Sequence, residues 1–146
     1  LLRQTLADMD GEIQKSGLTF KLDLPEQPVE ITADGTRLYR VFQNLLQNAL
    51  NYSLPGSRVY LSLKTTGKAA VASLRNTSRN ELPAGVDFTA RFVRGDESRT
   101  DGGTGLGLSV AKSFTEACGG TFRVETMADL FTAIVSFPLS MHEPKR

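Results

Sequence analysis

The chain has 146 residues, of which 40% are hydrophobic, and this length is sufficient for one domain with a substantial core. A formal net charge of +1 gives no electrostatic case for nucleic acid as a partner. One cysteine, Cys118, excludes an internal disulfide and fits a reducing compartment. No apolar run approaches the roughly 20 residues that span a bilayer. The chain begins without Met, so we expect a piece of a longer protein, and membrane attachment of that protein stays open.

Hydrophobic periodicity and turn residues predict the elements. A helical pattern ends at Ser16-Gly17, alternating residues predict strands, and Asp34 is a plausible N-cap for a long amphipathic helix. In chain order we expect a helix (2–15), two strands (18–24 and 29–32), a helix (34–53), a hairpin around Gly67 (58–65 and 69–76), a helix (106–118) and two strands (121–127 and 131–139).

Residues 77–104 show no lasting periodicity, and so long a connection in a compact domain is typical of a functional lid or of a disordered segment. A short helical turn is expected at 89–93, and the polar tail from Ser140 is expected to fray. Strands separated by helices, with hairpin-like pairs, predict an α/β two-layer sandwich. We expect a mixed sheet of about five strands backed by three helices.

Three asparagines, Asn44, Asn48 and Asn51, follow helical spacing on a face separate from the apolar one. Asparagine is a poor helix former, and a solvated face would more naturally use Glu, Lys or Gln. One interpretation is an ordinary exposed stripe. The other is a row of side-chain amides lining a ligand site, since carbonyl oxygens are hard ligands that magnesium accepts beside phosphates.

A glycine-rich run leads into the next helix and consists of Gly102, Gly103, Thr104, Gly105, Leu106, Gly107 and Leu108. Such a loop lets the backbone approach a ligand, and a helix N-terminus suits a phosphate. The spacing matches neither a dinucleotide fingerprint nor a P-loop. Taken alone, the run is equally well explained as a tight turn.

Together these motifs resemble bacterial sensor histidine kinases. Asp34-x-x-Arg37-Leu38 and the run 44–53 resemble the N box, and 103–108 resembles the second glycine box. Residues 91–99 are similar to the start of the ATP lid, and Gly119-Gly120-Thr121-Phe122 matches the turn that follows. The order and spacing agree over nearly the whole chain. The resemblance implies the ATP-binding catalytic domain with the Bergerat fold, shared with gyrase, MutL-type repair proteins and heat-shock chaperones.

The resemblance implies roles for single residues. Asn48 would hold Mg²⁺, Asn44 would contact the phosphates or bound water, and Tyr52 would stack on the adenine. Arg91 and Arg94 would reach the terminal phosphate from the lid, since arginine forks suit phosphate oxygens. The glycine box at 103–108 would cradle the phosphates, and an aromatic pair, Phe88 and Phe92, would pin the lid to the body. Where the family often has Lys or Arg, this chain has Asn51.

The largest departure is the first glycine box, normally Asp-x-Gly-x-Gly, which here reads Asn76-Thr77-Ser78-Arg79-Asn80. We interpret it as a variant in which Asn76 replaces the aspartate that reads adenine. An asparagine carries both an acceptor and a donor and can turn either way. We therefore expect weak ATP affinity and a looser preference for ATP over GTP.

The implied protein is larger than this chain. We expect residues 1–17 to be a linker helix from a missing upstream domain, 18–139 the ATP-binding domain with lid 77–104, and 140–146 a tail. The γ-phosphoryl acceptor would be a histidine on that upstream dimerisation domain, because the one histidine here, His142, lies in the tail. A response regulator would be the further partner. The domain would be cytoplasmic and monomeric by itself, in a homodimeric parent in the bacterial membrane.

Two alternatives stay open. The altered first glycine box is also compatible with a nucleotide-binding or scaffold module that no longer supports catalysis. An anti-sigma-factor type serine kinase of the same superfamily would share the motifs and work as a free-standing protein.

Overall fold

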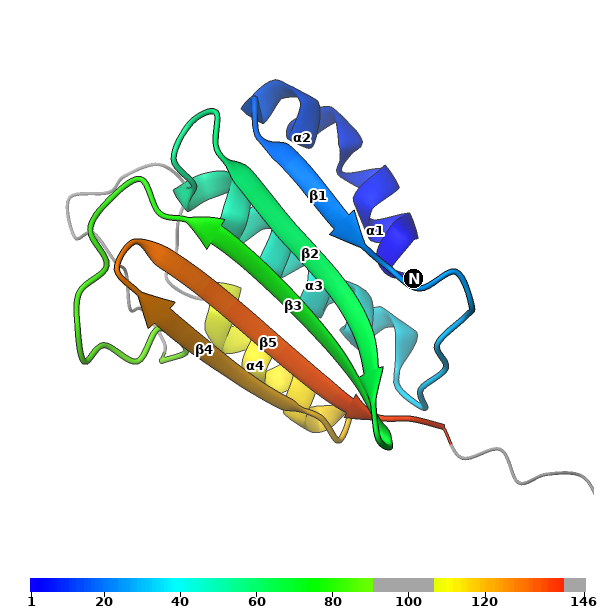
Figure 1. The fold of residues 1–146 in the computed structure, drawn as a ribbon. Coiled ribbons are helices and arrows are strands. Elements are labelled where there is room, and N and C mark those ends of the chain that lie inside the picture. Colours follow the sequence, from blue (N-terminus) through cyan, green and yellow to red (C-terminus); the bar gives the residue numbers. More distant parts are fainter. Residues whose placement is uncertain (91–106, 141–146) are drawn as a thin grey trace, which may run out of the picture.

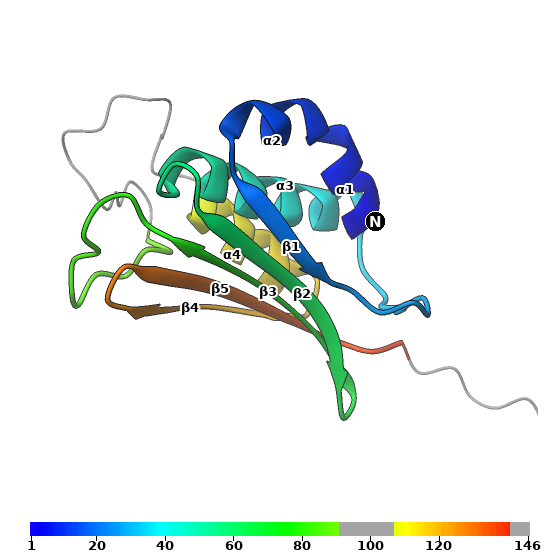
Figure 2. The same cartoon turned by 45° about the horizontal axis from the view of Figure 1, so that its top comes forward.

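The computed structural model describes residues 1–90 and 107–140, and in these ranges one mixed sheet carries helices on one face (Figures 1 and 2). The five strands lie in the order β1-β2-β3-β5-β4, which confirms the predicted α/β sandwich. The helices are α1 (Leu2–Asp8), α2 (Asp10–Ser16), α3 (Gly35–Tyr52) and α4 (Gly107–Ala117). The strands are β1 (Thr19–Asp23), β2 (Arg58–Thr66), β3 (Ala69–Thr77), β4 (Thr121–Met127) and β5 (Leu130–Pro138).

The predicted first helix is divided in two, so the described ranges contain four helices where three were expected. Met9, at φ −99° and ψ 8°, separates α1 from α2. The hydrogen-bond ladder still crosses the break, from Met9 N to Thr5 O at 3.1 Å and from Ile13 N to Met9 O at 3.0 Å. Gly11, two residues on, has the weakest helix propensity after proline and makes this turn easy to distort.

The first two helices pack on α3. Leu2 and Met9 belong to the hydrophobic core, and Thr5 between them has no exposed surface. Thr5 satisfies its hydroxyl by donating to Leu1 O at 2.9 Å. Tyr39 on α3 adds a polar link by donating to Asp8 Oδ2 at 3.0 Å, and this bond raises the pKa of the Tyr39 phenol. Residues 1–17 therefore lie against the body of the sandwich, and their role as a linker stays a prediction.

The long helix α3 forms as the sequence predicts. The Asp34 carboxylate accepts from Thr36 N at 2.9 Å and Arg37 N at 3.2 Å, which satisfies two of the free amides at the helix start. Its apolar stripe faces the sheet and is buried: Leu38, Val41, Phe42, Leu45, Leu46 and Ala49. The opposing face of the sheet supplies Val59, Leu61, Ala72, Leu74, Ala133 and Val135.

The expected hairpin is present, with β2 and β3 antiparallel around Gly67 at φ 58°, a conformation that glycine adopts without strain. β1 pairs parallel to β2, which makes the sheet mixed. The predicted strand 29–32 is wrong. Ile31 forms only an isolated bridge with Leu139, and Glu30 O accepts from Ser140 N at 2.9 Å. The segment therefore meets the chain only where β5 has ended, too briefly to form a ladder.

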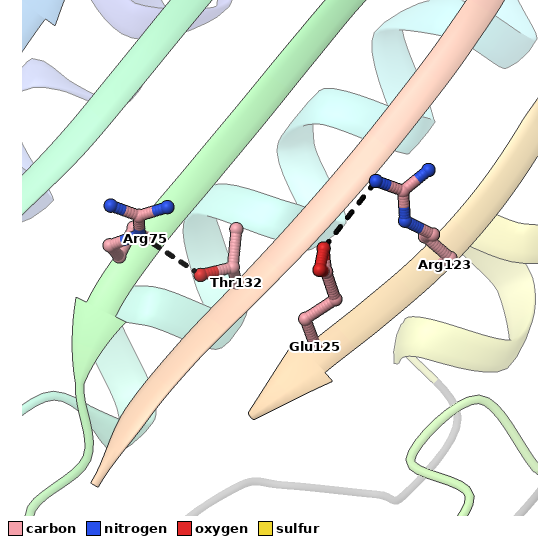
Figure 3. Close-up of polar contacts among 4 residues, drawn as sticks. All are labelled: Arg75, Arg123, Glu125 and Thr132. Carbon is pink, nitrogen blue, oxygen red and sulfur yellow. Dashed lines mark hydrogen bonds and ion pairs between the residues drawn. The ribbon is translucent and has the colours of Figure 1, made fainter. Parts of the chain in front are cut away.

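The second face of the sheet is polar and carries none of the described helices (Figure 2). Figure 3 shows two polar contacts on this face: Arg75 Nε on β3 donates to Thr132 Oγ1 on β5 at 3.1 Å, and within β4 the guanidinium of Arg123 lies 3.4 Å from the Glu125 carboxylate. The Arg123–Glu125 ion pair is exposed to water and is therefore worth little stability.

Candidate functional site

The C-terminal end of α3 is joined to the C-terminal end of β3. Leu54 N donates to Thr77 O at 2.8 Å, and Arg79 N donates to Tyr52 O at 2.9 Å. Ser53 and Ser78 form an isolated antiparallel bridge between these two bonds. Tyr52 and Asn76, which lie 24 positions apart in the sequence, are thereby brought to one corner, as the resemblance requires.

Asn76 lies on the helix-covered face of β3 and is 3% exposed. Its Nδ2 donates to the Oγ of Ser53 at 3.0 Å, and Ser53 is itself 6% exposed. Ser53 is the C-cap residue of α3, in extended conformation, with its amide still donating to Ala49 O at 3.0 Å. Ser53 is the last residue of the run 44–53 that resembles the N box, and the sequence alone predicts no role for it. A small polar residue at the helix end, before Leu54-Pro55-Gly56, was the available signal.

The three asparagines of α3 differ in their surroundings. Asn44 Nδ2 is buried and has no hydrogen-bond partner among the described residues. Asn48, one turn later, is half-buried, and Asn51 accepts from Gln47 Nε2 at 3.1 Å. A buried amide without a partner is costly, and native sites of this kind usually have a ligand, water or ion nearby. Asn44 and Asn48 therefore have unused hydrogen-bonding or ligand capacity, whereas Asn51 bonds within its own helix.

No group of three or more His, Cys, Asp or Glu side chains that could hold a metal occurs within residues 1–90 and 107–140. A cation here would take most of its ligands from a bound phosphate chain and from water, with a single protein amide added. That is the way magnesium is commonly held beside nucleotide phosphates. The donor set of α3 therefore fits a metal–nucleotide complex rather than a free metal.

The predicted phosphate loop lies only partly in the described ranges. Gly107 begins α4 and Leu108, half-buried, packs against the core, whereas Gly103, Thr104, Gly105 and Leu106 lie outside the described residues. Arg91, Arg94 and Phe92 lie outside them as well. The N-terminal end of α4 and the C-terminal ends of α3 and β3 meet at the same end of the sandwich (Figure 1).

The segment that follows β3 packs against the start of β5 and the turn before it. Ser78 N donates to Asp129 O at 2.7 Å, and Phe88 packs edge-to-face on Phe131 with centroids 5.6 Å apart. Asp87 accepts from both the amide and the hydroxyl of Thr89, and these bonds lower the pKa of its carboxyl. Ala90 N donates to Asp87 O at 3.2 Å, so a turn begins where the helical turn was expected.

Residues 33–141 match the family model of histidine kinase-, DNA gyrase B- and HSP90-like ATPases. This match covers most of the chain, and the chain belongs to that family. Membership shows an ATP-binding domain of the type that sensor histidine kinases use for catalysis, as the resemblance implies.

The curated relatives are sensor proteins, and a solved histidine kinase structure has the same fold. The chain is 35% identical over 139 residues to the probable sensor histidine kinase TcrY of Mycobacterium tuberculosis, covering 92% of this chain and 29% of that protein. It is 33% identical over 141 residues to the sensor protein VanSC of Enterococcus gallinarum, covering 94% and 38%. The chain thus spans well under half of these curated relatives. The mycobacterial sensor histidine kinase MprB has the same fold, with a TM-score of 0.80 at 23% identity over 94% of this chain and 93% of that one.

The described helices give no sign of a bilayer-spanning segment. None in residues 1–90 and 107–140 combines the length and the apolar character that crossing a membrane requires.

Proposed function

We propose that this chain is the catalytic ATP-binding domain of a sensor histidine kinase, which donates the γ-phosphoryl group of ATP to a histidine on a helical dimerisation domain of the same protein. The observation that carries this proposal is that the C-terminal ends of α3 and β3 and the N-terminal end of α4 lie at the same end of the sandwich (Figure 1), in a chain of this ATPase family. Phosphoryl transfer depends on positioning and on charge stabilisation, which is what such a corner supplies.

Each side chain has a task in this proposal. The Asn48 carbonyl oxygen coordinates Mg²⁺, and the Asn44 amide, buried without a described partner, donates to a phosphate or to metal-bound water. Tyr52 and Asn76 receive the base. Arg91, Arg94 and residues 103–108 contact the phosphates. Bound Mg²⁺ would neutralise phosphate charge as the γ-phosphoryl group departs.

The partners follow from the same chemistry. The phosphorylated histidine would pass its phosphoryl group to a response regulator, and one solved neighbour is a histidine kinase, ThkA, in complex with the response regulator protein TrrA. We propose that the isolated domain is a monomer, and that the parent protein is a homodimer in the bacterial cell membrane with this domain on the cytoplasmic side.

Substitution of Asn48 tests the metal–nucleotide site. Asn48→Ala removes one hard ligand, and we expect Mg-ATP affinity to fall about 5- to 150-fold, the equivalent of about 1–3 kcal/mol. Asn51→Ala is the matched control, because that side chain accepts from Gln47 within its own helix. Isothermal titration calorimetry measures both. An unchanged affinity for Asn48→Ala, or an equal loss for Asn51→Ala, would contradict the assignment.

A second function is favoured by the altered first glycine box. Residues 76–80 lack both glycines of the family pattern, with Ser78 and Asn80 in their places, and the chain at 76–78 runs as regular strand and bridge. A domain that binds nucleotide without transferring phosphate would explain this. Mg-ATP binding, without labelling of any histidine-bearing helical domain supplied to it, would favour this second function.

A further inference from the structure

We infer that the open face of the sheet carries a docking site for an acidic segment of another protein. The site is centred on Tyr60, and three cations on β1, β2 and β3 surround it: Lys21, Arg58 and Arg75. We call these four residues the Tyr60 cluster. The cluster lies on the face of the sheet away from α3 and α4, so its role is independent of the proposed nucleotide site (Figure 2).

The strand register brings the cluster together. Tyr60 pairs with Arg75 of β3 on one side and with Lys21 of β1 on the other. Arg58 lies two residues before Tyr60 on β2, so the two side chains leave the same face of the sheet. Val59, between them, is buried in the core on the helix side. Because neighbouring strands lie about 5 Å apart, one bound segment reaches the tyrosine and the cations together.

The charges of the cluster are not neutralised by neighbouring side chains. Two other cations on the open face have partners: Lys64 Nζ lies 3.2 Å from the Asp23 carboxylate, and Arg123 lies 3.4 Å from Glu125. Among the described residues, no acidic side chain forms an ion pair with a cation of the cluster. Like charges grouped on adjacent strands oppose folding, and the carboxylates of a partner would relieve that repulsion.

Arg75 is already oriented for a carboxylate. Its Nε donates to the Oγ1 of Thr132, which is 7% exposed, so one edge of the guanidinium is held against β5 (Figure 3). The two terminal nitrogens have no hydrogen-bond partner among the described residues. An arginine uses such a pair of donors to bind a carboxylate in bidentate fashion. Tyr60 beside it is 47% exposed, and tyrosine and arginine are the residue types that contribute most to protein interfaces.

The surroundings of the cluster favour a short acidic segment over an extended anionic surface. Asp23 lies two residues after Lys21 on β1, and Glu125 on β4 lies in the same row as Arg75, with Thr132 between them. A bilayer or a nucleic acid laid over this face would meet both carboxylates. The net charge of +1 also gives little long-range attraction to a polyanion. A protein segment with a few Asp or Glu side chains fits between the two carboxylates.

Titration with a soluble synthetic peptide of glutamate, glycine and leucine tests this inference, and the matching glutamine peptide is the control probe. In nuclear magnetic resonance spectra of the isotope-labelled chain, the acidic peptide should shift amide signals of β1, β2 and β3 around the cluster, and the glutamine peptide should not. Arg75→Gln should weaken binding of the acidic peptide about fivefold, the effect of one exposed charge pair. Tyr60→Ser should weaken it as well. Arg3→Gln is the matched control, because it removes the same charge from an exposed position on α1.

Three results would overturn the inference. The first is an acidic peptide that shifts no signal on β1, β2 or β3. The second is equal weakening by Arg75→Gln and Arg3→Gln, which would show attraction by net charge alone. The third concerns two competing probes, vesicles of phosphatidylcholine with phosphatidylserine and a single-stranded oligonucleotide. If either one binds more tightly than the peptide and loses that binding in Arg75→Gln, the face serves a lipid or nucleic-acid surface instead.

Discussion

The side-chain amide of Asn44 is a buried polar group without a hydrogen-bond partner among the described residues, which is rare in folded proteins. Its Nδ2 is buried and unpaired among the described residues, in the middle of a well-packed helix. Such a group opposes folding and favours binding, because a ligand oxygen relieves the cost. Functional sites are where stability is most often sacrificed in this way.

Asn44→Ala should therefore separate stability from binding. We expect the free energy of unfolding to rise by about 1 kcal/mol, because the unpaired amide is removed and alanine is the better helix former. We expect Mg-ATP affinity to fall. Chemical denaturation and calorimetry on the same samples measure the two effects.

The comparison variant is Leu46→Ala on the same helix, where the side chain is 1% exposed in the core and truncation should cost about 2–5 kcal/mol. A comparable loss of stability in Asn44→Ala would mean that the amide is satisfied in the folded chain.

At the scale of single residues, the sequence identifies candidate site residues but does not predict which of their side chains are hydrogen-bonded. The spacing of Asn44, Asn48 and Asn51 was enough to select α3 as the candidate site. That one amide is unpaired and another is bonded to Gln47 depends on side-chain packing. The Ser53–Asn76 contact joins residues 23 positions apart, and no local pattern predicts it.

At the scale of elements, the long periodic segments were predicted well and the short ones poorly. α3 and the β2–β3 hairpin carry strong patterns and clear capping or turn residues, and the structure confirms them. The segment 29–32 has strand-like composition, but its only β-bridge is the isolated one between Ile31 and Leu139. The break between α1 and α2 at Met9 could not be predicted from the sequence, because no proline and no capping side chain mark it. Tertiary packing decides such cases.

The turn between α4 and β4 shows one position where only glycine fits. A Cβ added to Gly120 would lie 2.5 Å from Ser136 O and 2.7 Å from Phe137 Cδ1. Gly120→Ala must displace β5 backbone or a buried ring. It should lower the free energy of unfolding by about 1–3 kcal/mol, as overpacking does.

Thermal or chemical denaturation measures the effect, and Gly35→Ala is the control. A Cβ at Gly35 meets nothing within 4 Å at the start of α3, so alanine there should be neutral or stabilising by up to about 1 kcal/mol. Equal behaviour of the two variants would show that the β4–β5 edge yields readily to an added methyl group.

At the scale of the whole molecule, the sandwich serves to hold one end of α3 against β3 and α4 while leaving the second face of the sheet polar (Figures 1 and 3). Two of the hydrogen bonds that join the ends of α3 and β3, Leu54 N to Thr77 O and Arg79 N to Tyr52 O, are backbone bonds, so they do not depend on the side chains of the altered first glycine box. This explains how the family fold persists although one of its motifs is altered.

The arrangement also predicts what this chain does not do alone. Its single histidine, His142, lies in a polar tail with no helical pattern around it, whereas phosphoryl transfer requires an acceptor positioned in line with the γ-phosphate. Incubation with radiolabelled ATP should therefore leave the chain without stable label. Adding the histidine-bearing helical domain of the parent protein should produce label on that domain, and His142→Ala should change neither result. Label that stays on this chain and disappears in His142→Ala would show that His142 accepts the phosphoryl group. The proposal that the acceptor histidine lies on a separate helical domain would then be wrong.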